Sequence, residues 1–300
     1  KGMFEDVLAI QEDRTDVVYL VTKRYINGRW SKFIEKFAPR EFSHVEDAHS
    51  VDCGLAVSGT SPAAGVQASA ASGAITLVAD APVFSSGDVG KVWRGGKGKG
   101  IVTAFNSTTS LEIELGRDIT NVLYEDPNNT PLPLLEGEWT LDAEFSTVSG
   151  LWHLEGETVQ VLLDGSVIED KIVTNGAITL DAAGTRCIIG LGFTAIAKTL
   201  PVSIEQNVVE GRRKAITGLM ARLNETRGLE SGMALDQMYE FRDRSTEDYG
   251  EATGLWDGMR PCKFRSAYSD DAQIYFRQAK PLPATILGYV AGTDIGDDPE

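Results

Sequence analysis

The sequence has 300 residues, of which 42% are hydrophobic and 24% are charged, and its formal net charge is −16 at pH 7. A chain of this length holds either two domains of ordinary size or one large sheet-rich domain. The excess of acids argues against nucleic-acid binding by phosphate neutralisation, and no run of about 20 apolar residues predicts a membrane-spanning helix.

Two features bear on the compartment and on the ends of the chain. Cys53, Cys187 and Cys262 are odd in number, far apart and outside any CxxC motif, so we expect reduced thiols in a cytosolic compartment, without a disulfide framework or a zinc site. The chain opens on Lys1 inside an apolar-alternating segment that has no signal-peptide pattern. We therefore expect that the natural protein has a further portion upstream.

The residues from Val7 to Phe37 are predicted to form strands and hairpins. The run DVVYLVTKRY is rich in β-branched and aromatic residues, Asn27-Gly28 is a favoured two-residue hairpin turn, and KFIEKF alternates behind it. Three short strands joined this tightly suit one sheet of a larger β structure, such as a propeller blade.

The next segment is predicted to be a small β-barrel inserted into a host domain. The stretch Ser58–Gly73 is small and polar, which marks a linker. Four strand-like runs follow, ITLVAD, VGKVWRGG, GIVTAFNS and SLEIEL, and the Pro-containing stretch YEDPNNTPLPLLEGE closes the segment before WTLDAEF. Short strands between flanking linkers are typical of an inserted barrel.

The stretch Ser149–Asp170, SGLWHLEGETVQVLLDGSVIED, holds one His, three Glu and two Asp. These residues could form a catalytic or metal-binding cluster, or they could belong to a tight turn and a hairpin whose polar side chains face water. Val159, Val161 and Leu163 alternate before an Asp164-Gly165 turn, so the pattern favours a turn that opens a β meander.

The sequence argues against a zinc site in this stretch more strongly than it argues against a glycosidase site. HLEGE lacks the HExxH spacing of a zinc helix, and the chain has only His44 and His49 besides His153. A glycosidase needs only two carboxylates about 5–10 Å apart, which 44 acidic residues allow. No feature selects one such pair.

Two basic stretches are candidate binding elements. RGGKGKG (Arg94–Gly100) lacks the GxxxxGK[ST] order of a phosphate-binding loop, and we interpret it as a hairpin connection. GRRK contains Arg212, Arg213 and Lys214, which either contact a neighbouring subunit or form a solvated strand entry.

The region after GRRK is ambiguous. Ile216, Leu219, Met220 and Leu223 have helical spacing, while Leu219, Ala221 and Leu223 also share one strand face. The last element, AQIYFRQAKPLPATILGYVAG, alternates and is broken by two prolines into two strands. With no GxSxG, no CxxC and no defensible Ser-His-Asp order, the sequence favours a structural or binding role over an enzyme.

The segments together resemble the tail hub or nozzle proteins of short-tailed bacteriophages, also called tail tubular protein B-like or tail stabilisation proteins. The resemblance is carried by RYINGRWSKFIEKF with VEDAHSVDCGL, by STVSGLWHLEGETVQVLLDGSVIEDKIVTNGAITL, and by IGLGFTAIAKTLPVSIE, GRRKAI and QIYFRQAKPLPATILGYV in the same order. It covers most of residues 18–58 and 145–290. HLEGETV is its most specific part.

The resemblance implies a structural motif without catalytic residues, cofactors or metals. Its motif residues in this sequence are Gly150, Leu151, Trp152, His153, Leu154, Glu155, Gly156, Asp164 and Gly165. Cys53 stands where the family pattern has Ser, and the segment from Ser58 to Thr147 varies or is absent in relatives, so what that insertion binds is not implied.

For the assembly, the resemblance implies a typically hexameric ring below the portal and adaptor proteins. Such a ring extends the DNA channel, binds tail fibres or a needle, and has a β-propeller upstream. We therefore expect a virion tail protein, assembled in the cytoplasm of a bacterial host, through which DNA passes transiently. The alternatives are a tail-associated polysaccharide depolymerase and a host-receptor-binding module.

The expected fold is all-β, with propeller-type strands at the N-terminus, an antiparallel β-sandwich or barrel platform, and an inserted small β-barrel. The expected divisions are residues 1–57 for the propeller-edge strands and the start of the platform, 58–147 for the inserted barrel with its linkers, and 148–300 for the platform or nozzle domain.

Overall fold

The computed structural model describes residues 2–12, 15–38, 42, 44–122, 130–202, 212–242 and 252–296. Within these ranges all regular elements are strands, apart from three short 3-10 turns, and several of the sheets are antiparallel. The expected all-β class with antiparallel sheets is confirmed. No helix long and apolar enough to span a membrane occurs in these ranges.

The chain forms two compact units. Unit 1 comprises Lys1–Leu55, Gly156–Ile172 and Ile188–Glu300, and unit 2 comprises Ala56–Glu155 and Val173–Cys187. Each unit is therefore made of segments that are distant in the sequence. The expected division at residues 57 and 147, which follows linker composition, stays a prediction.

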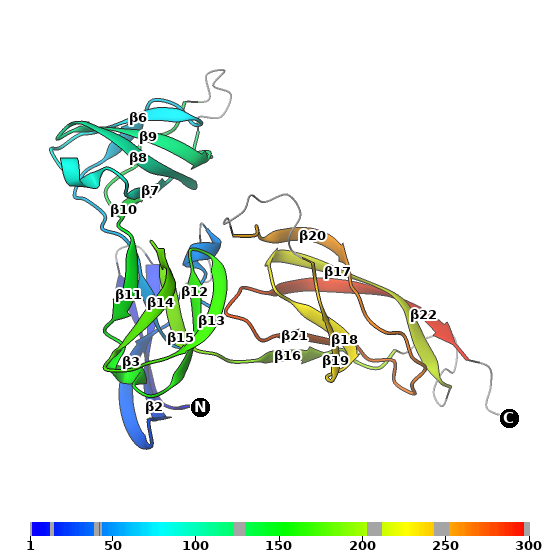
Figure 1. The fold of residues 1–300 in the computed structure, drawn as a ribbon. Coiled ribbons are helices and arrows are strands. Elements are labelled where there is room, and N and C mark those ends of the chain that lie inside the picture. Colours follow the sequence, from blue (N-terminus) through cyan, green and yellow to red (C-terminus); the bar gives the residue numbers. More distant parts are fainter. Residues whose placement is uncertain are drawn as a thin grey trace. The chain divides into compact units, whose positions relative to one another are not determined.

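Unit 1 begins with a three-stranded antiparallel sheet of β1 (Gly2–Glu12), β2 (Thr15–Ile26) and β3 (Arg29–Lys36), in that order (Figure 1). The predicted Asn27-Gly28 turn joins β2 to β3, with φ of 47° and 74°. One face of the sheet buries Thr22, Arg24 and Ile26, whereas every described residue of β1 before Glu12 is exposed.

A second sheet of unit 1 has the order β13-β12-β15-β4. Its strands are β4 (Asp52–Val57), β12 (Thr158–Leu163), β13 (Ser166–Ile172) and β15 (Cys187–Leu191). Val159, Val161 and Leu162 of β12 are fully buried. Buried Arg24 of β2 donates to Glu35 of β3 and, at 2.6 Å, to Asp52 of β4, so an ion-paired cluster joins β2, β3 and β4.

The remaining two sheets of unit 1 pack around a shared core. The sheet β16-β21-β18-β19 and the sheet β20-β17-β22 both contribute to it. Their strands are β16 (Ala195–Lys198), β17 (Lys214–Thr226), β18 (Glu230–Ala234), β19 (Gln237–Glu240), β20 (Trp256–Pro261), β21 (Tyr275–Gln278) and β22 (Thr285–Ile295). The ambiguous segment after GRRK is thus the strand β17, with Leu219, Ala221 and Leu223 on its buried face.

Unit 2 contains a six-stranded sheet in the order β10-β7-β8-β9-β6-β5 and a pair, β11 with β14 (Figure 1). The strands are β5 (Val66–Ala68), β6 (Ala74–Ala79), β7 (Val92–Gly95), β8 (Gly98–Ser107), β9 (Ser110–Arg117), β10 (Trp139–Asp142), β11 (Phe145–Ser149) and β14 (Ala177–Gly184). Isolated bridges Thr60↔Leu141 and Val66↔Leu134 connect chain segments at the two edges of the larger sheet. Trp93, Trp139 and Leu111 fill its core.

A buried ionic cluster connects three segments of unit 2, namely β7, β10 and the residues after β14. The Asp142 carboxylate, which is fully buried, accepts hydrogen bonds from Arg94 of β7 and, at 2.9 Å, from Arg186 Nε. Arg94 Nη2 also donates to Thr185 Oγ1 at 2.9 Å, and Arg186 Nη2 to Thr140 Oγ1 at 2.8 Å. The cluster therefore ties the segment after β14 to the six-stranded sheet.

Replacing the shared carboxylate should destabilise unit 2 strongly. In Asp142→Asn two buried guanidinium groups lose their counter-charge, and we expect the free energy of unfolding to fall by about 3–5 kcal/mol. Urea unfolding followed by circular dichroism measures the change. The exposed Asp118 provides the matched control, since Asp118→Asn should shift stability by no more than about 0.5 kcal/mol. Equal effects of the two substitutions would contradict a stabilising ionic cluster.

Candidate functional site

The first candidate is the HLEGETV stretch, which forms a tight turn. Trp152–Leu154 is a 3-10 turn closed by a 2.8 Å hydrogen bond from Leu154 N to Leu151 O. Leu151 and Leu154 are fully buried, and Gly150 precedes the turn with a φ of 90° that favours glycine. The two buried leucines thus fix the turn at its two ends, and His153 lies between them within the turn.

The carboxylate of Glu155 binds a hairpin turn of unit 2. It accepts hydrogen bonds from Asn175 N at 2.9 Å and from Gly176 N at 2.6 Å, while Gly176 O accepts from Leu151 N at 2.8 Å. Asn175 and Gly176 have φ of 55° and 66°. A Cβ at Gly176 would overlap the indole of Trp152. Glu155 therefore fixes a turn, and its oxygens are occupied by backbone donors.

The carboxylate of Glu157 has the same role in unit 1. Its Oε1 accepts from Asn27 N at 2.8 Å, at the turn between β2 and β3. The Asn27 side chain lies beside Gly156, whose missing Cβ would be 3.4 Å from Asn27 Oδ1. Gly156 has a φ of 78°, so glycine is favoured at this position for backbone reasons as well.

The last two motif residues, Asp164 and Gly165, form the predicted turn between β12 and β13, with φ of 45° and 80°. A Cβ at Gly165 would be 2.7 Å from Val45 Cγ1. The Gly165 carbonyl accepts a 2.6 Å hydrogen bond from Arg227 Nη1. The motif residues that the structure describes are thus turn and packing residues. The described part of the chain has no group of three or more His, Cys, Asp or Glu that could hold a metal ion.

The basic cluster GRRK is divided between the surface and the interior. Lys214 is buried, its ammonium donates to the Asp270 carbonyl at 2.8 Å, and its backbone pairs with Ser269. Arg213 is exposed and donates to the Tyr268 carbonyl at 2.9 Å. Lys214 therefore has an internal role in unit 1. A subunit contact made by Arg212 and Arg213 stays a prediction.

The RGGKGKG stretch is the hairpin between β7 and β8, as predicted. Its glycines are needed for packing. A Cβ at Gly98 would be 2.7 Å from Ile119 Cγ1, and one at Gly100 would be 2.6 Å from Ile113 Cγ2. Arg94, the first residue of the stretch, is buried in the ionic cluster with Asp142. The glycines allow close approach of neighbouring side chains, and the stretch joins two strands, whereas a phosphate-binding loop joins a strand to a helix.

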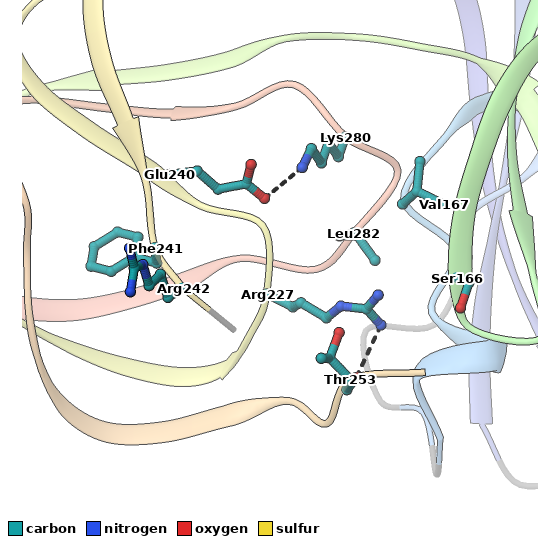
Figure 2. Close-up of a pocket in the computed structure, with 9 residues that line it drawn as sticks. All are labelled: Ser166, Val167, Arg227, Glu240, Phe241, Arg242, Thr253, Lys280 and Leu282. Carbon is teal, nitrogen blue, oxygen red and sulfur yellow. Dashed lines mark hydrogen bonds and ion pairs between the residues drawn. The ribbon is translucent and has the colours of Figure 1, made fainter. Parts of the chain in front are cut away.

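A second candidate site, which the sequence did not suggest, is a cavity of about 570 Å³ in unit 1 (Figure 2). Arg227 points into it and is held by the carbonyls of Gly165 and Thr253 at 2.6 and 3.0 Å. Lys280 pairs with Glu240 at 2.5 Å across one side. The lining residues are Ser166, Val167, Arg227, Glu240, Phe241, Arg242, Thr253, Lys280 and Leu282.

The charged side chains that line this cavity are mainly cationic. Its lining contains three cations and one carboxylate, Glu240, so the described residues around it lack the second carboxylate that glycoside hydrolysis uses. A sequence reading could not have found it, because Ser166, Arg227 and Lys280 are more than 50 residues apart from one another and no local pattern connects them.

No family model matches the sequence, and no curated protein matches it.

None of the three cysteines forms a disulfide, and two of them have strongly raised pKa values. Burial raises the pKa of Cys53 to about 12 and that of Cys262 to about 11, because desolvation penalises the thiolate. Cys53 also has a φ of 53°, an unusual conformation for a residue with a side chain.

These pKa shifts predict slow alkylation. A raised pKa keeps the folded thiol neutral at pH 8, so Cys53 should carry about 2,000-fold less thiolate than an unperturbed cysteine of pKa about 8.5. Iodoacetamide labelling read by mass spectrometry should modify Cys53 and Cys262 slowly in the folded chain and rapidly in denaturant. Rapid labelling of Cys53 in the folded chain would contradict its burial.

Removing the Glu155 carboxylate should loosen the turn at Asn175 and Gly176. Glu155→Ala leaves two backbone N–H groups without their acceptor, and we expect a loss of about 1–3 kcal/mol of unfolding free energy. Thermal unfolding and amide hydrogen exchange at Gly176 measure it. Glu144→Ala, at an exposed position of the same unit, is the control and should change neither quantity. Unaltered exchange at Gly176 in Glu155→Ala would contradict the role of the carboxylate.

Proposed function

We propose that the protein is a structural subunit of the tail of a short-tailed bacteriophage, in a ring-shaped hub or nozzle that extends the DNA channel, stabilises the tail and permits genome ejection. The ring is a homo-oligomer, typically a hexamer, and its further partners are portal or adaptor proteins and tail fibres or a needle. The protein is a virion component without enzymatic activity. The sequence resemblance motivates this proposal, and three features of the structure support it.

The observation that carries the proposal is the apolar outer face of the sheet β1-β2-β3. We define this face as Met3, Leu8, Ile10, Tyr25, Trp30 and Ile34, which the strand register places on one side of the sheet. Leu8 is 59% exposed and Ile34 is 78% exposed. Exposed apolar surface that extends across all strands of a sheet marks an interaction site. A subunit of a permanent assembly has such a surface.

The charges on the outer face are compatible with close packing. Lys32 pairs with Glu5 at 2.6 Å, and Lys36 pairs with Glu12 at 2.7 Å. Lys23 lies 5.5 Å from the centre of the Trp30 ring. Although the whole chain carries a net charge of −16, the lysines on this face have acidic or aromatic neighbours within the sheet. A second protein can therefore contact it with little local charge repulsion.

The finer fold assignments belong to the same proposal. We assign β1-β2-β3 to a propeller-type domain, because three consecutive antiparallel strands in this order are the arrangement found within a propeller blade. We assign the six-stranded sheet of unit 2 to a small inserted barrel, since the bridges Thr60↔Leu141 and Val66↔Leu134 connect segments at its two edges.

The net charge fits a conduit for DNA. Carboxylates that face a channel repel phosphates, so the genome passes without binding to the wall. The motif acids Glu155 and Glu157 accept hydrogen bonds from backbone N–H groups. These two carboxylates would otherwise be the first candidates for catalysis, and the hydrogen bonds give them a structural role instead.

The assembly is tested by disrupting the outer face. The wild-type chain should sediment as an oligomer and appear as rings in electron micrographs, with more than about 1,000 Å² buried per contact. Leu8→Asp combined with Ile34→Asp should produce monomers that keep the wild-type circular-dichroism spectrum, because both side chains are exposed within the subunit. Ile101→Asp with Leu135→Asp, at exposed positions of unit 2, should leave the oligomer intact.

Two outcomes would overturn the proposal. One is a wild-type chain that stays monomeric at every concentration. The other is release of reducing ends or fragments when the chain is incubated with capsule polysaccharide or peptidoglycan, which would identify a depolymerase or wall hydrolase.

A further inference from the structure

The sequence contains two Asn-Gly dipeptides, Asn27-Gly28 and Asn175-Gly176. Both lie in two-residue turns with positive φ at each residue. Asn-Gly is chemically labile, because glycine has no side chain to hinder attack by its backbone nitrogen on the preceding amide. The two sites share the Asn-Gly dipeptide and have similar φ values, 47° and 74° against 55° and 66°, so the main difference between them lies in their surroundings.

The surroundings of Gly28 are open. Nothing lies within 4 Å of the position that a Cβ on Gly28 would take, and both Asn27 and Gly28 are exposed. The nearby carboxylate of Glu157 accepts the N–H of Asn27, at 2.8 Å. It does not engage the Gly28 nitrogen, which is the atom that would attack.

The surroundings of Gly176 oppose the same reaction in two ways. Its N–H donates to Glu155 Oε2 at 2.6 Å, and the negative carboxylate disfavours the amide anion that must form before attack. The indole of Trp152 also covers Gly176 so closely that a Cβ there would overlap it. Reaction at this turn requires both contacts to open.

We propose that Asn27 is a site of spontaneous covalent modification in the folded protein, and that Asn175 is protected by Glu155 and Trp152. The Gly28 nitrogen attacks Asn27 Cγ, a new N–Cγ bond forms, and the Cγ–Nδ2 bond breaks. Ammonia leaves with the proton of the Gly28 amide. Water then opens the resulting succinimide at either carbonyl and yields aspartate or isoaspartate, so the only co-reactant is water.

The modification acts on the contact between the β2–β3 turn and the HLEGETV stretch. The product carries a carboxylate beside Gly156, where the Asn27 amide lies 3.4 Å from the missing Cβ, and near the Glu157 carboxylate that binds Asn27 N. The new carboxylate and that of Glu157 carry like charges, which repel each other. Isoaspartate also adds one backbone carbon to a two-residue turn. Modification therefore weakens the Glu157 hydrogen bond that fixes the end of the hairpin.

The test is a comparison of the two sites in one sample. The folded full-length chain is incubated in mildly alkaline buffer, and peptides are mapped by mass spectrometry with enzymatic methylation of isoaspartate. Asn27 should convert at least about tenfold faster than Asn175. This is the rate factor that corresponds to the stabilisation from a hydrogen bond to a charged group. In denaturant the two sites should convert at similar rates.

Variants at the protecting residues sharpen the comparison. Glu155→Gln removes the negative charge, and Trp152→Ala removes the cover. Each should accelerate conversion at Asn175 and leave the rate at Asn27 unchanged. Glu157→Gln is the matched control and should not accelerate Asn175. The proposal is overturned if Asn175 converts as fast as Asn27 in the folded wild-type chain, or if neither protecting substitution changes the rate at Asn175.

Discussion

The structure of the motif region depends on one kind of interaction, a glutamate carboxylate that accepts backbone N–H groups at the end of a hairpin. Glu155 does this at Asn175 and Gly176, and Glu157 does it at Asn27. A type of turn in which both residues have positive φ leaves donors that strand pairing does not use. A charged acceptor satisfies such donors more strongly than a neutral one. The acids of HLEGETV are thus explained by the turns that they hold.

This explanation accounts for what the sequence could and could not predict. The turns at Asn27-Gly28, Asn175-Gly176 and Asp164-Gly165 were predictable, because positive φ is a local requirement that few residues meet. The acceptors of those turns were not. Glu155 and Asn175 are 20 residues apart, and Glu157 and Asn27 are 130 residues apart. No short-range pattern links a carboxylate to a particular distant turn.

Strand β17 shows a different limit. Leu219 and Leu223 are four residues apart, a spacing that places them on one face of a helix and also on one face of a strand. Ala221 between them is buried, and Gly218 lowers helix propensity. The pairing with β20 and β22 decides the outcome, since it satisfies the backbone of β17 on both sides. Tertiary context, which the sequence pattern does not contain, selects the strand.

The burial of charged side chains in unit 2 also depends on residues that are distant in the sequence. Arg94, Asp142 and Arg186 come from separate parts of the sequence, and each looks like an ordinary surface residue in its local pattern. In unit 2 they meet in the interior. A buried cluster of this kind adds less stability than its charges suggest, because desolvation offsets the attraction. However, any packing of the chain that buries one of these three charged side chains without its partners is strongly destabilised, because the buried charge is then uncompensated. The cluster therefore contributes chiefly to the specificity of the packing between the β7–β10 edge and the segment after β14.

The net charge of the chain also bears on the exposed sheet β1-β2-β3. At physiological ionic strength, charges separated by more than about 8 Å are largely screened. The charge of −16 therefore acts mainly between surfaces that are already close, and it opposes contact wherever acids face acids. On the outer face of β1-β2-β3, Lys32 and Lys36 are matched by Glu5 and Glu12, and apolar side chains occupy the space between them. In an acidic protein, a charge-balanced apolar face is the surface on which association meets the least repulsion, which is why we propose this face as the contact between subunits.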